Sequence, residues 1–189
     1  MQMHKTDLGL WMTTLLLLLI PAGVYSEPAA TLEHGRNLFY RAVTSETALD
    51  SAVTVFDSLH TTGSVSESLV EVYLGSLTCL KGKHTFWPQK KYRHVKEGLV
   101  MMDNAVKQDP DNVEVLFIRA TTTFYLPSFF GHNQQALDDM NKLSRLLPEV
   151  SLEYPAGLIL NVGEFLLENA QLNSDSRTNL QAMLTGLGS

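Results

Sequence analysis

Apolar residues recur at helical spacing through most of this sequence. The clearest run predicts one apolar stripe along a helix from about Gln89 to Gln108. Its members are three or four residues apart: Tyr92, Val95, Leu99, Met102 and Val106. Strand patterns are nearly absent, because the sequence has no Asn-Gly or Asp-Gly turn between alternating apolar residues and no long β-branched run. The chain is therefore expected to be all-α.

The same periodicity predicts about seven or eight helices joined mostly by short turns, which implies antiparallel neighbours. The expected helices are Thr31–Val43, Glu46–Leu59, Leu69–Lys81, Gln89–Gln108, Val113–Tyr125, Asn133–Leu146, Pro155–Ala170 and Asp175–Leu184. The expected breaks between them lie at Gly63, Pro110, Pro127, Gly131, Pro148 and Pro155.

Two helix starts carry the spacing of a capping box, in which a side chain before the helix and an acid three residues later satisfy free backbone N–H groups. Asp111 and Glu114 have this spacing before the helix at Val113. Ser64 and Glu67 repeat it before the helix at Leu69. Glu114 and Glu67 are therefore each expected to bind a free backbone N–H group at the start of their own helix.

The length of 189 residues suits one domain with a real core. The formal net charge of −6 argues against nucleic acid as a partner, because phosphate binding needs a basic surface. Cys79 is the only cysteine, which excludes an internal disulfide and a zinc site built from thiolates. It lies among leucines in the middle of an expected helix, so it is expected to be buried and inert.

Residues 1–26 have the composition of a cleavable export signal: Lys5 near the start, an apolar run over Leu15–Ile20, and a small-residue exit at Ser26. The competing interpretation is a spanning anchor, but the uninterrupted apolar run is shorter than the roughly 20 residues that a span needs. We therefore expect an exported single domain over residues 27–189 with no stable membrane span. One cysteine and no disulfide fit a bacterial periplasm; secretion or N-terminal anchoring are the alternatives.

A pattern of four positions occurs twice in the sequence, each time in the second half of a repeat unit. A small residue is followed by a large one four positions on, a small or medium one three positions later, and a proline five positions after that. The two copies are Gly98, Met102, Ala105 and Pro110, and Ala136, Met140, Leu143 and Pro148. A weaker copy without the proline has Ala52, Phe56 and Leu59. This pattern resembles the tetratricopeptide repeat.

The resemblance implies a right-handed stack of antiparallel helical hairpins. Small residues would lie where the two helices of a hairpin approach, and about three hairpins are needed to bury a common core. Repeat-like hairpins are expected over residues 31–148 and capping helices over 149–189. The chain is similar to small exported bacterial proteins with degenerate repeats, most of which have no assigned activity.

The spacing departs from the family at two places. The small residues of the paired helices are about twelve apart in the family, whereas Ala120 and Ala136 are 16 apart and Gly75 and Gly98 are 23 apart. The hairpin connections are therefore expected to be extended, and extended loops on a rigid scaffold are where binding residues tend to lie.

The longer insertion, Lys81–Lys96, holds six of the 14 Lys and Arg residues of the chain, together with Phe86, Trp87 and Tyr92. Such a mixture of cations and rings is typical of a site for an anionic partner, such as an acidic peptide, a carboxylate or a phospholipid head group. The alternative is a solvated loop held down by Phe86 and Trp87.

The shorter insertion, residues 126–132, contains Phe129 and Phe130. Exposed rings would anchor a partner, but burial between hairpins is favoured, because monomers rarely leave such patches uncovered. Both insertions join the helices of a hairpin and could share an edge of the stack. The residues expected to meet a partner are Lys83, His84, Trp87, Lys90, Lys91, Tyr92, Arg93, Phe129 and Phe130.

Catalytic and metal-binding patterns are weak. The five histidines after the signal include no pair at helical i, i+4 spacing, and His84 and His94 are separated by a proline. Asp138 and Asp139 are expected on a solvated helix face. No catalytic residue, metal site or cofactor is expected, and the methionines are expected to pack the core.

The sequence therefore predicts a non-enzymatic interaction scaffold that binds a protein or peptide, possibly an acidic one, through a helical-hairpin groove and the basic aromatic insertion. The alternative is an accessory subunit of an envelope transport system that holds a small anionic or apolar molecule. An open groove lined by polar side chains would favour a peptide, and a closed pocket reached through the two insertions would favour a small ligand. Oligomeric state is not predicted.

Overall fold

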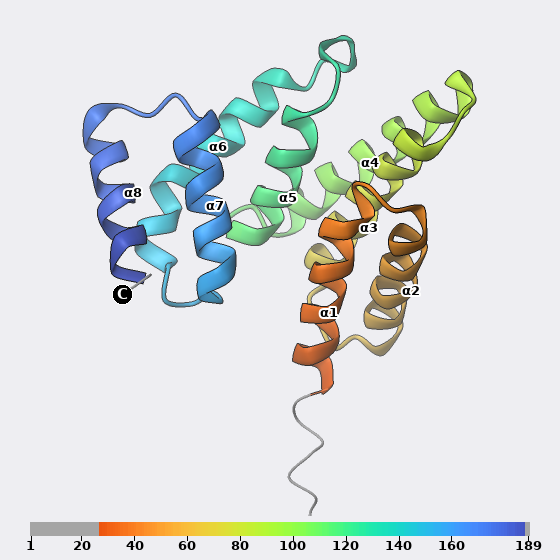
Figure 1. Ribbon diagram of the computed structural model, residues 1–189, viewed down its shortest axis with the longest axis horizontal. Coiled ribbons are helices and arrows are strands. Elements are labelled where there is room, and N and C mark those ends of the chain that lie inside the picture. The colour runs from red at the N-terminus through yellow and green to blue at the C-terminus, as the bar shows by residue number, and fades with distance from the viewer. Residues whose placement is uncertain (1–26, 188–189) are drawn as a thin grey trace, which may run out of the picture.

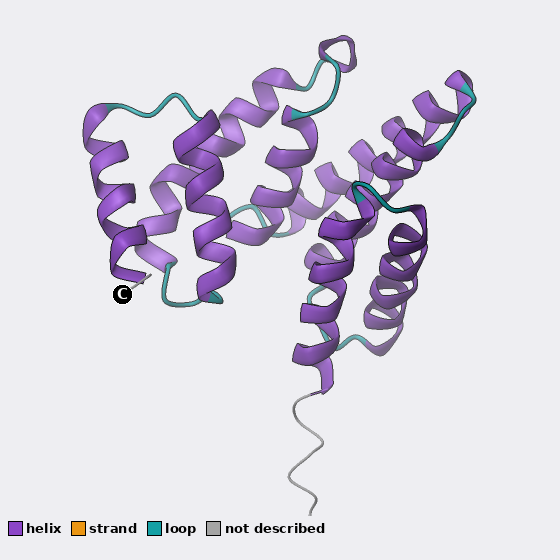
Figure 2. Ribbon diagram, in the orientation of Figure 1, coloured by secondary structure: helices purple, strands orange, loops and turns teal. Residues whose placement is uncertain are grey.

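The computed structural model describes residues 27–187, and the expected export signal lies outside them. The described chain contains helices and no strands (Figure 2). The α-helices are α1 (Glu27–Ala42), α2 (Glu46–Thr62), α3 (Glu67–His84), α4 (Pro88–Gln108), α5 (Val113–Phe124), α6 (Asn133–Val150), α7 (Ala156–Asn169) and α8 (Ser174–Leu187), with a short 3-10 helix, η1, at Ser128–Phe130. The expected all-α class is confirmed.

Consecutive helices pair as hairpins, and the hairpins stack (Figure 1). The pairs are α1 with α2, α3 with α4, α5 with α6 and α7 with α8. Helix α3 also packs against α2 and α5, so it is central to the first three hairpins. Helix α6 contacts both members of the last pair, which covers the end of the stack.

The residues of the repeat pattern line the core. Ala52, Phe56, Met102 and Ala105 have no exposed surface. The corresponding positions of the third copy, Ala136, Met140 and Leu143, are at most 1% exposed. Each hairpin therefore buries the positions at the expected offsets, as the periodicity predicts.

Gly75 and Gly98 mark the closest approach of α3 and α4. A Cβ atom on Gly75 would lie 2.9 Å from the carbonyl oxygen of Gly98, and one on Gly98 would overlap the carbonyl oxygen of Gly75. Neither contact is possible for a larger residue without movement of the backbone. The two glycines thus act as the small residues that let this hairpin close.

Both expected capping boxes are wrong by one or two residues. Helix α3 is capped by Ser66, whose hydroxyl accepts from Leu69 N at 3.4 Å, while Ser64 bonds to the Thr62 hydroxyl. Helix α5 is capped by Asn112, whose side-chain oxygen accepts from Glu114 N and Val115 N, both at 3.1 Å. Asn is as good a cap as Asp, so composition alone did not separate Asn112 from its neighbour Asp111.

The 81–96 insertion is a pair of longer helices and not an extended loop, contrary to expectation. Helix α3 runs on to His84, α4 begins at Pro88, and residues 85–87 connect them. Proline is acceptable in the first turn of a helix, where its missing N–H has no partner in any case. The hairpin therefore projects as a rigid arm, seen in yellow-green in Figure 1. Helix α6 likewise continues through Pro148, which was expected to end it.

Candidate functional site

Exposed aromatic rings gather at the ends of two neighbouring hairpins. On the α3–α4 arm, Phe86 is 86% exposed, Trp87 59% and Tyr92 54%. On the α5–α6 connection, Phe129 is 75% exposed. We call these residues, with Phe130 and the cations Lys90, Lys91, Arg93 and Lys96, the tip surface. The expected burial of Phe129 is wrong, as is the alternative in which Phe86 and Trp87 lie beneath the insertion.

Ring contacts join the two hairpin ends into one surface. Tyr92 stacks on Phe130 with ring centroids 5.7 Å apart. The ring centroid of Phe129 lies 4.5 Å from that of Phe130. Phe130 is partly buried and packs against the core, so it holds the α5–α6 end in place. The two insertions therefore do share an edge of the stack.

The cations of the insertion divide into two groups. The exposed side chains of Lys90, Lys91 and Lys96 form no ion pair within residues 27–187, and Arg93 is 3.6 Å from Glu97. Lys83 and His84 instead donate to the carbonyl oxygens of Val43 and Ala42, at 2.7 and 3.0 Å. These two anchor the arm to the first hairpin, a structural role that the sequence did not predict.

The tip surface lies away from two small hollows in the described chain. One, of about 220 Å³, lies between α6 and α8 around Asn141 and Gln171, and the other, of about 190 Å³, lies between α2 and α3 around His60 and Val70. Neither is lined by a tip residue, and both are below the roughly 300–1,000 Å³ of usual ligand pockets. Neither hollow is therefore a closed pocket reached through the two insertions.

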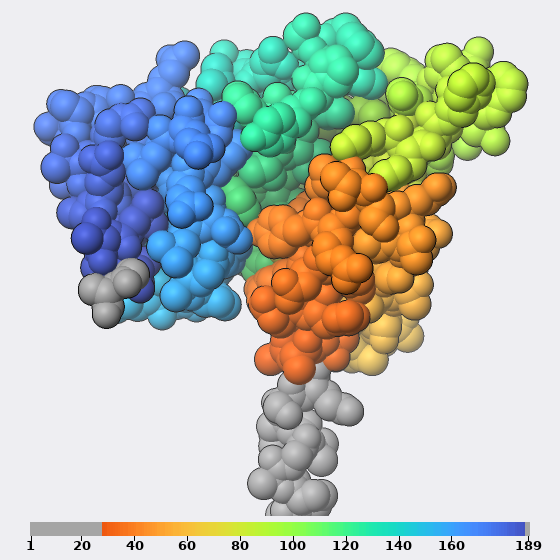
Figure 3. All heavy atoms as spheres, in the orientation of Figure 1, coloured from red at the N-terminus to blue at the C-terminus, as the bar shows by residue number. Residues whose placement is uncertain are grey.

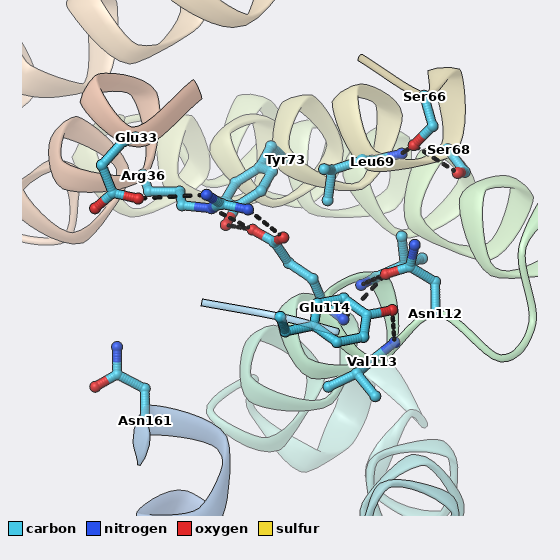
Figure 4. Close-up of polar contacts among 12 residues, drawn as sticks. Glu33, Arg36, Ser66, Ser68, Leu69, Tyr73, Asn112, Val113, Glu114 and Asn161 are labelled. Atoms are coloured by element: carbon cyan, nitrogen blue, oxygen red, sulfur yellow. Dashed lines mark hydrogen bonds and ion pairs between the residues drawn. The ribbon is translucent and has the colours of Figure 1, made fainter. Parts of the chain in front are cut away.

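A buried carboxylate of α5 binds side chains of α1 and α3 (Figure 4). Glu114 accepts from Arg36 Nε at 2.7 Å and Nη2 at 2.6 Å, and the Tyr73 hydroxyl donates to it at 2.6 Å. Burial and the nearby carboxylate raise the pKa of Tyr73, so this phenol stays protonated as a donor. The sequence predicted Glu114 only as a cap, and no local pattern linked it to Arg36.

A second ionic cluster connects α4, α5 and α6. Arg119 donates to both oxygens of Asp139, at 2.9 and 2.7 Å, and to Asp103 at 3.1 Å. Asp139 is 4% exposed, so its expected place on a solvated face is wrong. All of these polar atoms have partners, and the cluster is therefore structural.

A groove runs between α1 and α7, visible as the hollow between the orange and blue helices in Figure 3. The amide of Asn161 on α7 points into it and lies 3.4 Å from the Tyr40 hydroxyl of α1 (Figure 4 shows Asn161). This hydrogen bond bridges the two walls of the groove, and the groups that meet there are polar. Glu33, also on α1, is 59% exposed.

Other reactive groups within residues 27–187 are sequestered or dispersed. Cys79 is buried, and burial raises the pKa of its thiol to about 12. No three His, Cys, Asp or Glu side chains of the described chain lie close enough together to share a metal ion. None of its helices is long and apolar enough to cross a membrane.

Comparisons with protein-family models, with curated proteins and with solved structures found no match for this chain. The resemblance to the tetratricopeptide family therefore stays a prediction from the repeat pattern.

Proposed function

We propose that this chain is an exported, non-enzymatic interaction scaffold of tetratricopeptide type that holds a peptide or protein partner in the groove of its hairpin stack. The observation that carries the proposal is the groove between α1 and α7, whose two walls present polar groups to each other. Extended peptides are bound in such grooves by side chains and backbone together, whereas small molecules favour enclosed apolar pockets.

Helix α1, which forms one wall of the groove, is held in place, which supports this role. Arg36 of α1 and Tyr73 of α3 bind the buried Glu114 carboxylate of α5 with three short hydrogen bonds, so this wall is already ordered before a partner arrives. A preformed surface loses little conformational entropy on binding. Export is supported by residues 1–26, and the basic insertion is expected to supply charge toward an acidic partner.

The test is capture of partners by the full chain from an envelope fraction, followed by mapping of the captured segment on the purified pair. Tyr40→Ala combined with Asn161→Arg changes both rims and is expected to abolish capture. Asn104→Arg, at an exposed position of α4, is the matched control and is expected to retain it. Equal capture by the two variants would place the partner outside the groove.

A further inference from the structure

We propose that the tip surface docks on the face of a bilayer containing anionic phospholipid. This inference goes beyond the proposed function, because it gives the scaffold a second contact that does not use the groove. It commits the tip to lipid, where the sequence had left an acidic protein and a head group both open.

The exposed rings are of the kind that bilayer interfaces accept. Trp and Tyr concentrate at the head-group level of membranes because they combine an apolar body with a polar edge. Trp87 and Tyr92 are 59% and 54% exposed, and Phe86 beside them is 86% exposed. Water contact of so much aromatic surface is unfavourable, and an interface would relieve it.

The cations around these rings match an anionic surface. Lys90, Lys91 and Lys96 have no ionic partner in the described chain, and no acid occurs from Val72 to Lys96. Each Lys or Arg near an anionic bilayer adds favourable energy that falls off within a Debye length. The whole protein has a net charge of −6, so the surface outside the tip is repelled by an anionic bilayer. This repulsion, together with the attraction of the tip cations, would orient the tip toward the membrane.

The projecting position of the tip favours lipid over a folded partner. The rings lie at the ends of two hairpins and line neither of the two hollows described above, so an acidic protein would have to fit itself around them. Lipid head groups rearrange around any protruding ring. The charged groups of the tip cations in the first turns of α4 would then lie at the level of the lipid phosphates. The aliphatic parts of these side chains would lie along the apolar layer.

The tip is also held rigid, which lowers the entropic cost of docking. The Tyr92–Phe130 stack fixes the spacing of the two hairpin ends, and Phe129 supplies a second contact point. Lys83 and His84, the last two residues of α3, tie the end of the arm to α1 and the turn after it. Docking therefore needs no rearrangement of the fold.

The experiment follows Trp87 fluorescence in the full chain carrying Trp11→Phe, since these are the two tryptophans of the sequence. The probes are vesicles of phosphatidylcholine alone and of phosphatidylcholine with phosphatidylglycerol. We expect a blue shift only with the anionic vesicles, and quenching by lipids brominated near the head group. Because the signal comes from Trp87, any binding of vesicles by residues 1–26 does not enter it.

Two tip variants should weaken the response. Lys90→Glu with Lys91→Glu is expected to lower the vesicle affinity at least about tenfold. Phe86→Ser with Phe129→Ser is expected to lower it by a similar factor. The matched controls are Lys107→Glu for charge, at the far end of α4, and Leu152→Ser for an apolar side chain that is 90% exposed, in the turn after α6. Both should respond like the parent chain.

Four results would overturn the proposal. The first is an unchanged Trp87 spectrum with anionic vesicles. The second is equal weakening by tip and control variants. The third is a Trp87 response to polyglutamate but not to vesicles, which would assign the tip to an acidic protein. The fourth is displacement of the protein from vesicles by inorganic phosphate at the same concentration as the lipid. It would show that the tip binds single phosphate ions and would contradict bilayer docking.

Discussion

Arg36 and Glu114 form a two-pronged ion pair across 78 positions of the sequence, with N···O distances of 2.7 and 2.6 Å. The pair ties α1 of the first hairpin to α5 of the third, and Tyr73 of the intervening α3 donates to the same carboxylate. Three successive hairpins therefore share one buried charge, whose side chain is 2% exposed.

Glu114→Ala should be strongly destabilising. It leaves the guanidinium of Arg36 partly buried without its main partner and the Tyr73 hydroxyl without an acceptor. Breaking a buried pair by removing one partner typically costs about 3–5 kcal/mol. Urea denaturation followed by circular dichroism should show that loss in the free energy of unfolding.

Glu33→Ala is the matched control, because Glu33 also contacts Arg36, at 3.3 Å, but is 59% exposed. Its loss should cost less than about 1 kcal/mol. A double replacement, Arg36→Met with Glu114→Leu, should recover much of the stability, since no charge is then left unpaired. Similar losses for Glu33→Ala and Glu114→Ala would contradict this account.

The sequence predicted the helices well because each one carries its own period and breakers. Helix α2 was expected at Glu46–Leu59 and is found at Glu46–Thr62. The buried ionic clusters were not predictable in the same way. Glu114 and Asp139 look like an ordinary cap and an ordinary surface acid, and only tertiary packing brings Arg36 and Arg119 to them.

For the tip surface, the sequence identified the residues but not their exposure or the exact ends of the helices that carry them. Composition showed that cations and rings alternate between Lys81 and Lys96. The sequence also predicted a helix from Gln89, close to the observed start of α4 at Pro88, but it ended the preceding helix at Lys81, whereas α3 runs to His84, because helix ends depend on which residue acts as the cap. Burial of Phe129 and Phe130 was favoured, and the structure divides them, one exposed and one packed on the core.

Gly98→Ala should lower the free energy of unfolding by about 1–3 kcal/mol, since an added methyl group overpacks a closed contact. The new Cβ would overlap the Gly75 carbonyl oxygen and lie 2.6 Å from Cys79 Sγ. Gly157→Ala is the control, because no atom lies within 4 Å of its added Cβ, and its effect should stay within about 1 kcal/mol in the stabilising direction. Thermal unfolding of both variants would decide; a neutral Gly98→Ala would contradict the close approach.

Cys79 should resist alkylation by iodoacetamide at pH 8 until the protein unfolds, because its folded pKa is raised from 9.0 to about 12 by burial. Above pH 9 the unfolded thiol loses its proton while the native thiol keeps it. The native state then binds more protons, so stability is complete below pH 9 and falls as pH rises toward 12, by up to about 1.4 kcal/mol per pH unit.

Urea titrations at several alkaline pH values would measure this decline. Cys79→Ala removes the titrating group and should have a shallower decline, although Tyr73, whose pKa is also raised, remains and acts in the same direction. An identical slope for the parent and the variant would show that the thiol does not carry the effect.

Tyr92 and Phe130 should be coupled energetically, because their rings are stacked at 5.7 Å and join the two hairpin ends. A double-mutant cycle with Tyr92→Ala and Phe130→Ala, read by urea denaturation, should give an interaction energy of about 0.5–1.5 kcal/mol. The same cycle with Tyr92→Ala and Phe86→Ala is the control and should give a value near zero, since Phe86 contacts the ring of Trp87 instead. Because the first pair bridges the two hairpins, its coupling measures how firmly they hold the tip surface as one unit; additive effects for Tyr92 and Phe130 would mean that the two ends move independently.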